Sequence, residues 1–149
     1  MLDRSSPEGQ ITAAAMRLAE QHDWDDISLA AIAREANIPL HELRKHFSGK
    51  SKILRAFVRA VDDEVLERAS SQTSADDSPR DRLFDVLMTR FEVLEPYKAA
   101  LKKIAGTGGF EPELIRPILN SQRWMLIAAG IPADGMAGIV RTTGLSTVY

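Results

Sequence analysis

The chain has 149 residues, of which 44% are hydrophobic and 27% are charged, and its formal net charge at pH 7 is -2. This length allows one ordinary domain, or a small head fused to a modest body, and excludes a repeat array or a large enzyme. The absence of cysteine excludes disulfides, thiolate zinc sites and cysteine nucleophiles together, and it is compatible with a reducing cytoplasm. No apolar run approaches the roughly 20 residues that a membrane-spanning helix needs. Because no export signal opens the chain either, we expect a cytoplasmic protein without a membrane span.

The first predicted element is a helix over residues 10–22, where apolar side chains recur at helical spacing. Residues 1–9 are polar and rich in turn-forming types, which predicts a flexible arm ahead of this helix. The helical pattern stops before Trp24, and we expect this side chain to fill the junction with the next helix, together with Ile27.

A helix, a tight turn and a second helix are predicted over residues 28–47. Ser28 offers a hydroxyl to the free backbone amides that begin the first of these helices. Asn37 follows its last residue, where a left-handed backbone is often required and Asn tolerates it well. Pro39 suits the first turn of the next helix because its φ angle is fixed. The result is a compact three-helix head over residues 10–50.

The rest of the chain is also expected to be helical. Residues 51–69 form a predicted connecting helix, and the polar residues 70–78 form a loop before a C-terminal body over residues 79–149. Pro96 interrupts the body, and its last helix begins near Met136. The first helix of the body is expected to turn these apolar side chains inward: Leu83, Phe84, Leu87, Met88, Phe91 and Leu94. The predicted fold is therefore all-α, with a three-helix helix-turn-helix head followed by a helical bundle.

Positive charge is concentrated between residues 41 and 59. This stretch has one acid, Glu42, and six basic residues, which are Arg44, Lys45, Lys50, Lys52, Arg55 and Arg59. Proteins that bind a polyanion such as DNA usually carry such a cluster of basic residues. In addition, a tight turn before a third helix is the geometry that places this helix in the DNA major groove. A solvated helical face would carry the same charges, and many three-helix units bind only proteins. The charges alone leave these alternatives open.

A more specific signal is the sequence ISLAAIAREANIPLHELRKHFSGKSKIL, over residues 27–54. It resembles the signature of the TetR family of bacterial transcriptional regulators: a Ser or Thr cap, an apolar-Ala pair, a small or Asn turn residue, an aromatic residue, then Lys and an apolar residue. The residues at those positions are Ser28, Ile32, Ala33, Asn37, Phe47, Lys50 and Leu54. By this resemblance the chain is identified as a member of the family, with an N-terminal DNA-binding domain and a C-terminal helical domain for ligand binding and dimerisation.

The resemblance also implies which residues touch DNA. Ser28 and Lys50 are expected to contact phosphates, whereas the side chains expected to face the major groove are Leu40, His41, Arg44 and Lys45. Phosphate contacts set affinity and register, and an arginine can donate two hydrogen bonds to guanine. A plain helix cap would equally explain Ser28, and a solvated lysine would equally explain Lys50.

The chain departs from the family pattern in its third helix. Arg44 stands where the family usually has a Tyr whose hydroxyl reaches a phosphate. His41 and Glu42 stand where small residues often let the helix sit deep in the groove. A glutamate can accept a hydrogen bond from cytosine, but it also repels phosphate. The alternative function is therefore that of a relative that has lost DNA binding, such as the lipid- or isoprenoid-binding proteins of ubiquinone biosynthesis.

In family members the C-terminal helices enclose a small-molecule pocket and form the dimer interface. Large or flexible apolar groups suit an adaptable cavity, and the candidate wall residues are Phe84, Met88, Phe91, Tyr97, Phe110, Trp124 and Met125. The same side chains at helical spacing would also suit a plain core. Family members usually extend well beyond the length of this chain, so we expect the dimerisation part of the body to be incomplete.

Catalysis is not expected. Gly49-Lys50-Ser51 mimics the end of a phosphate-binding loop, but Arg44 occupies the place of its required first glycine. The histidines lack metal-ligand spacing, and we expect no metal and no cofactor. The sequence predicts a ligand-responsive repressor that binds a palindromic operator in double-stranded DNA as a homodimer and responds to an unidentified small apolar effector.

Overall fold

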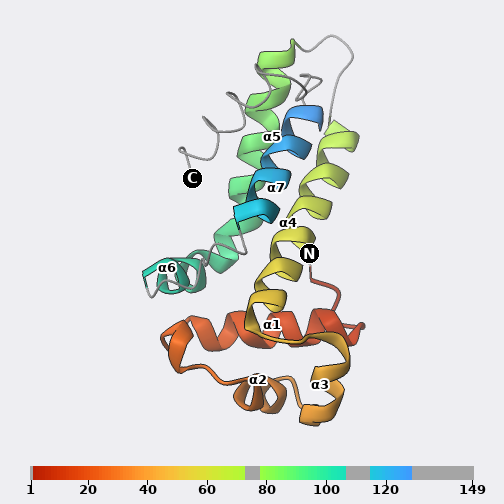
Figure 1. Cartoon of the computed structure of the whole chain (residues 1–149). Coiled ribbons are helices and arrows are strands. Elements are labelled where there is room, and N and C mark those ends of the chain that lie inside the picture. Colours follow the sequence, from red (N-terminus) through yellow and green to blue (C-terminus); the bar gives the residue numbers. More distant parts are fainter. Residues whose placement is uncertain (1, 73–77, 107–114, 129–149) are drawn as a thin grey trace. The chain divides into compact units, whose positions relative to one another are not determined.

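The computed structural model describes residues 2–72, 78–106 and 115–128. Its elements are α1 (Pro7–Ala19), η1 (Trp24–Asp26), α2 (Leu29–Glu35), α3 (Leu40–His46), α4 (Lys50–Gln72), α5 (Pro79–Leu94), η2 (Glu95–Tyr97), α6 (Lys98–Gly106) and α7 (Ile115–Ala128) (Figure 1). The described residues form helices and no strand, which confirms the predicted all-α class. The predicted helix from Met136 and the candidate wall residue Phe110 lie outside the described residues.

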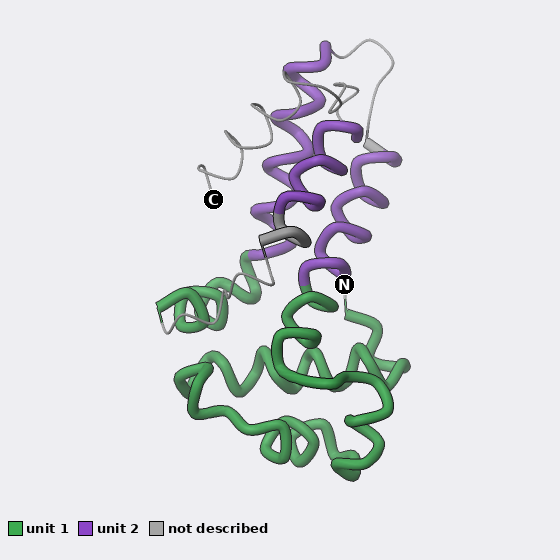
Figure 2. The backbone as a smooth tube through the Cα atoms, in the orientation of Figure 1, with its two compact units in different colours: residues 1–57, 95–114 green, residues 58–94, 115–149 purple. Residues whose placement is uncertain are grey.

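The chain divides into two compact units (Figure 2). Unit 1 comprises Met1–Phe57 and Glu95–Leu114, and unit 2 comprises Val58–Leu94 and Ile115–Tyr149. The division falls inside α4, whose first two turns belong to unit 1. α6 belongs to unit 1 as well, and it packs on α1.

α1 begins at Pro7, three residues before its predicted start at residue 10. The Ser6 hydroxyl accepts a hydrogen bond of 3.1 Å from the Gly9 amide and so caps the helix, and Pro7 fits its first turn. A Cβ atom on Gly9 would lie 1.8 Å from the Asp3 carbonyl oxygen, so only glycine allows this close approach. The predicted arm over residues 1–9 is therefore partly helical.

The turn between α2 and α3 has the predicted left-handed residue, because Asn37 has a φ of 58°. The Ile38 amide donates to the Ala33 carbonyl at 3.0 Å, and the Asn37 amide donates to the Arg34 carbonyl at 3.1 Å. These two bonds form a Schellman motif, which satisfies carbonyls that the end of α2 would otherwise leave unpaired. The turn thus ends α2 and directs the chain into α3.

The core of unit 1 holds α3 through very few side chains. Leu43 is the buried residue of α3, and Phe47, directly after the helix, is buried as well. Among the largest fully buried apolar side chains of unit 1 are Ile11 and Met16 of α1, Ile32 of α2, and Ile53 and Leu54 of α4. Since successive residues of a helix point to different sides, one buried position leaves most of α3 facing outward.

Asn37 gives a test of this turn. Asn37→Ala is expected to lower the free energy of unfolding by about 1 kcal/mol or more, because a Cβ without a local hydrogen-bonding group disfavours positive φ. Asn37→Gly is the matched control and is expected to stay within about 0.5 kcal/mol of the wild type. Urea denaturation followed by circular dichroism measures both. Equal losses in the two variants would contradict the role given to backbone conformation.

Candidate functional site

The residues expected to face DNA lie on the exposed side of α3. The side chains of His41 and Lys45 are 73% and 65% exposed, and Arg44 is exposed as well. Leu40, the first residue of the helix, is 51% exposed despite its apolar side chain. The structure therefore brings the four predicted groove residues together on one short helix whose buried position is Leu43.

The acid on this helix is paired. Lys45 donates a hydrogen bond of 2.9 Å from Nζ to Glu42 Oε1, and His41 Nε2 lies 3.7 Å from the same oxygen. The Lys45 hydrogen bond and charge lower the pKa of Glu42 below its ordinary value. Arg44 makes no hydrogen bond or ion pair within the part of the chain that the structure describes. Arg44 is thus a guanidinium with all its donors available to a ligand.

Ser28 caps α2, as one of the two interpretations of this residue predicts. Its hydroxyl accepts a hydrogen bond of 3.0 Å from the Ala31 amide, and the residue is exposed. A hydroxyl that accepts through oxygen can still donate its proton, so the cap leaves Ser28 able to bind a phosphate oxygen. The structural and the functional role are compatible in the same side chain.

Lys50 has partners within unit 1. Its Nζ donates a hydrogen bond of 2.6 Å to the Trp24 carbonyl and lies 5.1 Å from the centre of the Trp24 ring. Trp24 is 3% exposed, so this lysine links the start of α4 to the buried residue that fills the junction after α1. The sequence predicts the place of Trp24 but gives no signal for its pairing with a lysine 26 residues away.

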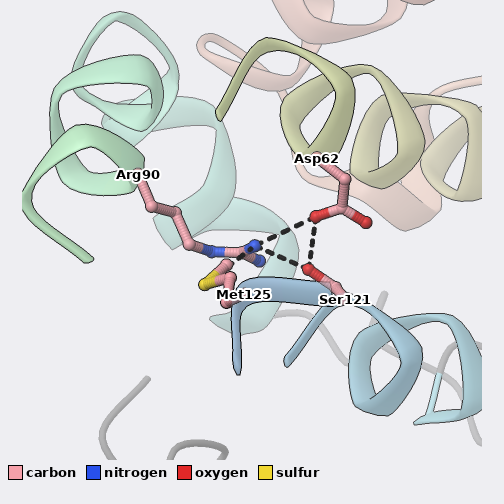
Figure 3. Close-up of polar contacts among 4 residues, drawn as sticks. All are labelled: Asp62, Arg90, Ser121 and Met125. Carbon is pink, nitrogen blue, oxygen red and sulfur yellow. Dashed lines mark hydrogen bonds and ion pairs between the residues drawn. The ribbon is translucent and has the colours of Figure 1, made fainter. Parts of the chain in front are cut away.

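Unit 2 contains a buried polar centre that the apolar pattern did not predict (Figure 3). Arg90 of α5 is 7% exposed, and its Nη1 lies 3.1 Å from Asp62 Oδ1 of α4 and 2.6 Å from Ser121 Oγ of α7. Ser121 also donates to Asp62, and Met125 Sδ lies 3.9 Å from Arg90 Nη1. Burial raises the pKa of Asp62, and the bonds from Ser121 and Arg90 oppose part of that increase.

The predicted inward face of α5 is wrong. Phe84, Met88 and Phe91 are 62%, 44% and 45% exposed, whereas the buried side chains are Val86, Thr89, Arg90 and Val93. α5 carries apolar residues on two sides, and the ion pair of Arg90 with Asp62 belongs to the side that packs. Because arginine is treated as a polar surface residue when apolar periodicity is used, the pattern predicts that the other side of α5 is buried.

The remaining candidate wall residues are distributed over both units. Met125 is buried and Trp124 is 46% exposed, both on α7 of unit 2. Tyr97 belongs to unit 1, where its ring meets that of Phe57 edge-on with 5.0 Å between the centroids. Burial raises the pKa of the Tyr97 hydroxyl.

Among residues 2–72, 78–106 and 115–128, no group of three histidine or acidic residues is placed to hold a metal ion. None of the helices in these ranges has the length and hydropathy of a membrane span.

The fold and the exposed third helix define the class of the protein, which is an all-helical protein with an N-terminal helix-turn-helix. Residues 11–57 match the family model described as "Bacterial regulatory proteins, tetR family". The structure is similar to the crystal structure of a TetR transcriptional regulator from Rhodococcus sp. RHA1, with 19% sequence identity and a TM-score of 0.63. The match covers 93% of this chain and 77% of that chain, and it shows that the fold is the same. No curated protein sequence matches the chain. Residues 11–57 are thus similar to the tetR family of bacterial regulatory proteins, and the chain has the fold of the Rhodococcus regulator.

The buried polar centre of unit 2 gives a second test. Arg90→Met is expected to lower the free energy of unfolding by roughly 3–5 kcal/mol at neutral pH, because it leaves the Asp62 carboxylate buried without its cation. The loss of Arg90 raises the pKa of Asp62 further, so the folded variant binds a proton more tightly than the unfolded chain. The penalty is therefore expected to shrink as the pH falls and Asp62 becomes protonated.

The control for this test is the double variant with Arg90→Met and Asp62→Leu, which removes both charges. We expect it to recover most of the lost stability at neutral pH. Chemical denaturation between acid and neutral pH measures the three proteins. A penalty for Arg90→Met that is independent of pH, with no recovery in the double variant, would show that the ion pair is not what stabilises this centre.

Proposed function

We propose that the chain is a ligand-responsive repressor that binds a palindromic operator in DNA as a homodimer. The observation that carries the proposal is the exposed face of α3, where Arg44 has all its donors available while Leu43 anchors the helix. In a helix-turn-helix the second of the two helices lies in the major groove, and its first residues reach base edges. Leu40 and His41 occupy those first positions, and both are exposed.

The residues that are placed to bind phosphates support the same function. Ser28 begins α2 with an exposed hydroxyl, and Arg44 stands where family members place a phosphate-binding tyrosine. Exposed basic side chains continue into the first turns of α4, with Lys52 and Arg55. Because Lys50 is already bonded to Trp24, we assign it the smaller part of the DNA affinity and Arg44 the larger.

The effector part of the proposal rests on unit 2. Phe84, Met88 and Phe91 form an exposed apolar stripe on α5, and Trp124 is exposed on α7. We propose that an unidentified small apolar molecule binds these side chains and favours one spacing of the two DNA-binding heads. Its binding would then change the affinity for the operator. Two heads on successive major grooves are about 34 Å apart, so a small change of spacing is enough to weaken binding. The proposed location is the cytoplasm.

Selection of DNA from a random library by the full chain tests this function. The expected result is an enriched palindrome whose binding weakens steeply as the salt concentration rises. Arg44→Ala is expected to weaken binding at least about fivefold, since each good contact to a base or a phosphate contributes on the order of 1–3 kcal/mol. Lys102→Ala, which removes an exposed charge from α6, is the matched control and should leave binding within about twofold.

Two results would contradict the proposal. One is that no sequence is enriched and the affinity stays in the non-specific range at low salt. The other is that a chain that enriches no DNA sequence co-purifies with a lipid or isoprenoid. Native mass spectra would show this molecule, and it would identify the carrier function instead.

A further inference from the structure

Glu42 is an acid on the face that has to approach a polyanion. It lies in the first turn of α3, its side chain is 41% exposed, and it is the single acid between His41 and Arg59 in the sequence. A carboxylate near phosphates reduces affinity unless its charge is compensated or it makes a contact of its own. The residues around Glu42 compensate its charge and also leave one of its oxygens available for such a contact.

The two carboxylate oxygens of Glu42 differ in their surroundings. Both neighbours contact Oε1, Lys45 Nζ at 2.9 Å and His41 Nε2 at 3.7 Å. Oε2 has no hydrogen-bond partner among the residues that the structure describes. Lys45 therefore compensates the charge and fixes the side chain through one oxygen, and it leaves the other oxygen as an acceptor. An ionised carboxylate has no proton to donate, so Oε2 can only accept.

The edges of the bases decide what such an acceptor can recognise. In the major groove, guanine presents the acceptors N7 and O6, and thymine presents the acceptor O4 and a methyl group. Adenine presents an amino group beside the acceptor N7, which repels a carboxylate. Cytosine presents the N4 amino group as its donor without an adjacent acceptor of its own. A carboxylate oxygen that can only accept therefore fits cytosine best.

We propose that Glu42 reads one cytosine in each operator half-site by accepting a hydrogen bond from its N4 amino group on Oε2, while Lys45 stays bonded to Oε1. This inference rests on the proposed DNA-binding function and adds a residue that determines sequence specificity. The general repulsion of DNA by Glu42 is balanced by Lys45, and the specific contact is retained.

The experiment compares the DNA sequences that the wild-type chain, Glu42→Gln and Glu42→Ala enrich from one random library. The wild type is expected to enrich cytosine at one position of each half-site, with roughly five- to hundredfold discrimination against the other bases. Glutamine has the same shape and pairs with the N6 and N7 of adenine through two hydrogen bonds, so Glu42→Gln is expected to change that position to adenine. Glu42→Ala is expected to lose the preference at that position and keep it at all others.

Glu20→Gln is the matched control, because Glu20 is an exposed acid at the end of α1 and its removal changes the net charge equally. It should leave the preference at every position unchanged. Melting curves of the four proteins check that each variant is folded.

The failure of this inference differs from the failure of the proposed function. If both Glu42 variants enrich the wild-type sequence with equal or uniformly higher affinity, Glu42 reads no base, and DNA binding itself stands. If the wild-type chain enriches no sequence, the proposed function fails and the cytosine contact is excluded with it.

Discussion

α3 has seven residues, which is too short for a helix to be stable by itself in water, so its exposed face depends on the contacts that hold it. Leu43 is its one buried position, Phe47 anchors the chain directly behind it, and the left-handed turn at Asn37 sets its direction in front. Three points fix the helix and require nothing of the remaining side chains. The exposed residues of α3 can therefore be replaced by others that suit a different ligand without loss of the fold.

The two units use polar side chains in different ways. In unit 1 the ionised groups of α3 lie at the surface, where Lys45 and Glu42 pair with little cost of desolvation. In unit 2 the pair of Arg90 and Asp62 is buried and completed by Ser121, so each member needs the others to avoid an uncompensated charge. The first arrangement suits recognition of an external partner, and the second fixes how three helices pack.

The sequence predicted what depends on neighbouring residues. The cap at Ser28 and the left-handed Asn37 follow from local backbone chemistry, and the structure confirms them. The start of α1 at Pro7 departs from the predicted start at residue 10, although its signal is equally local: Ser6 is a cap and Pro7 a first-turn proline.

What the sequence could not predict depends on pairs that are distant along the chain. Lys50 meets Trp24 across 26 residues, and Arg90 meets Asp62 across 28, and no local pattern encodes either pairing. The second pairing decides which face of α5 is buried, so the error in that face follows from the missing ion pair. The pairing of Glu42 with Lys45 is of the other kind, because the two residues are three apart on one helix, where helical spacing brings their side chains together.

The proposed function requires that the exposed face of α3 lies in the major groove of DNA. The chain has no cysteine, so a single Leu40→Cys variant can carry a photo-crosslinking group at the first residue of α3, and Lys102→Cys can carry the same group on α6 as a control. On an enriched DNA sequence, we expect the Leu40 position to crosslink to bases at one fixed site in each half-site and the Lys102 position to give no such crosslinks. Equal, scattered crosslinking from both positions would contradict the claim.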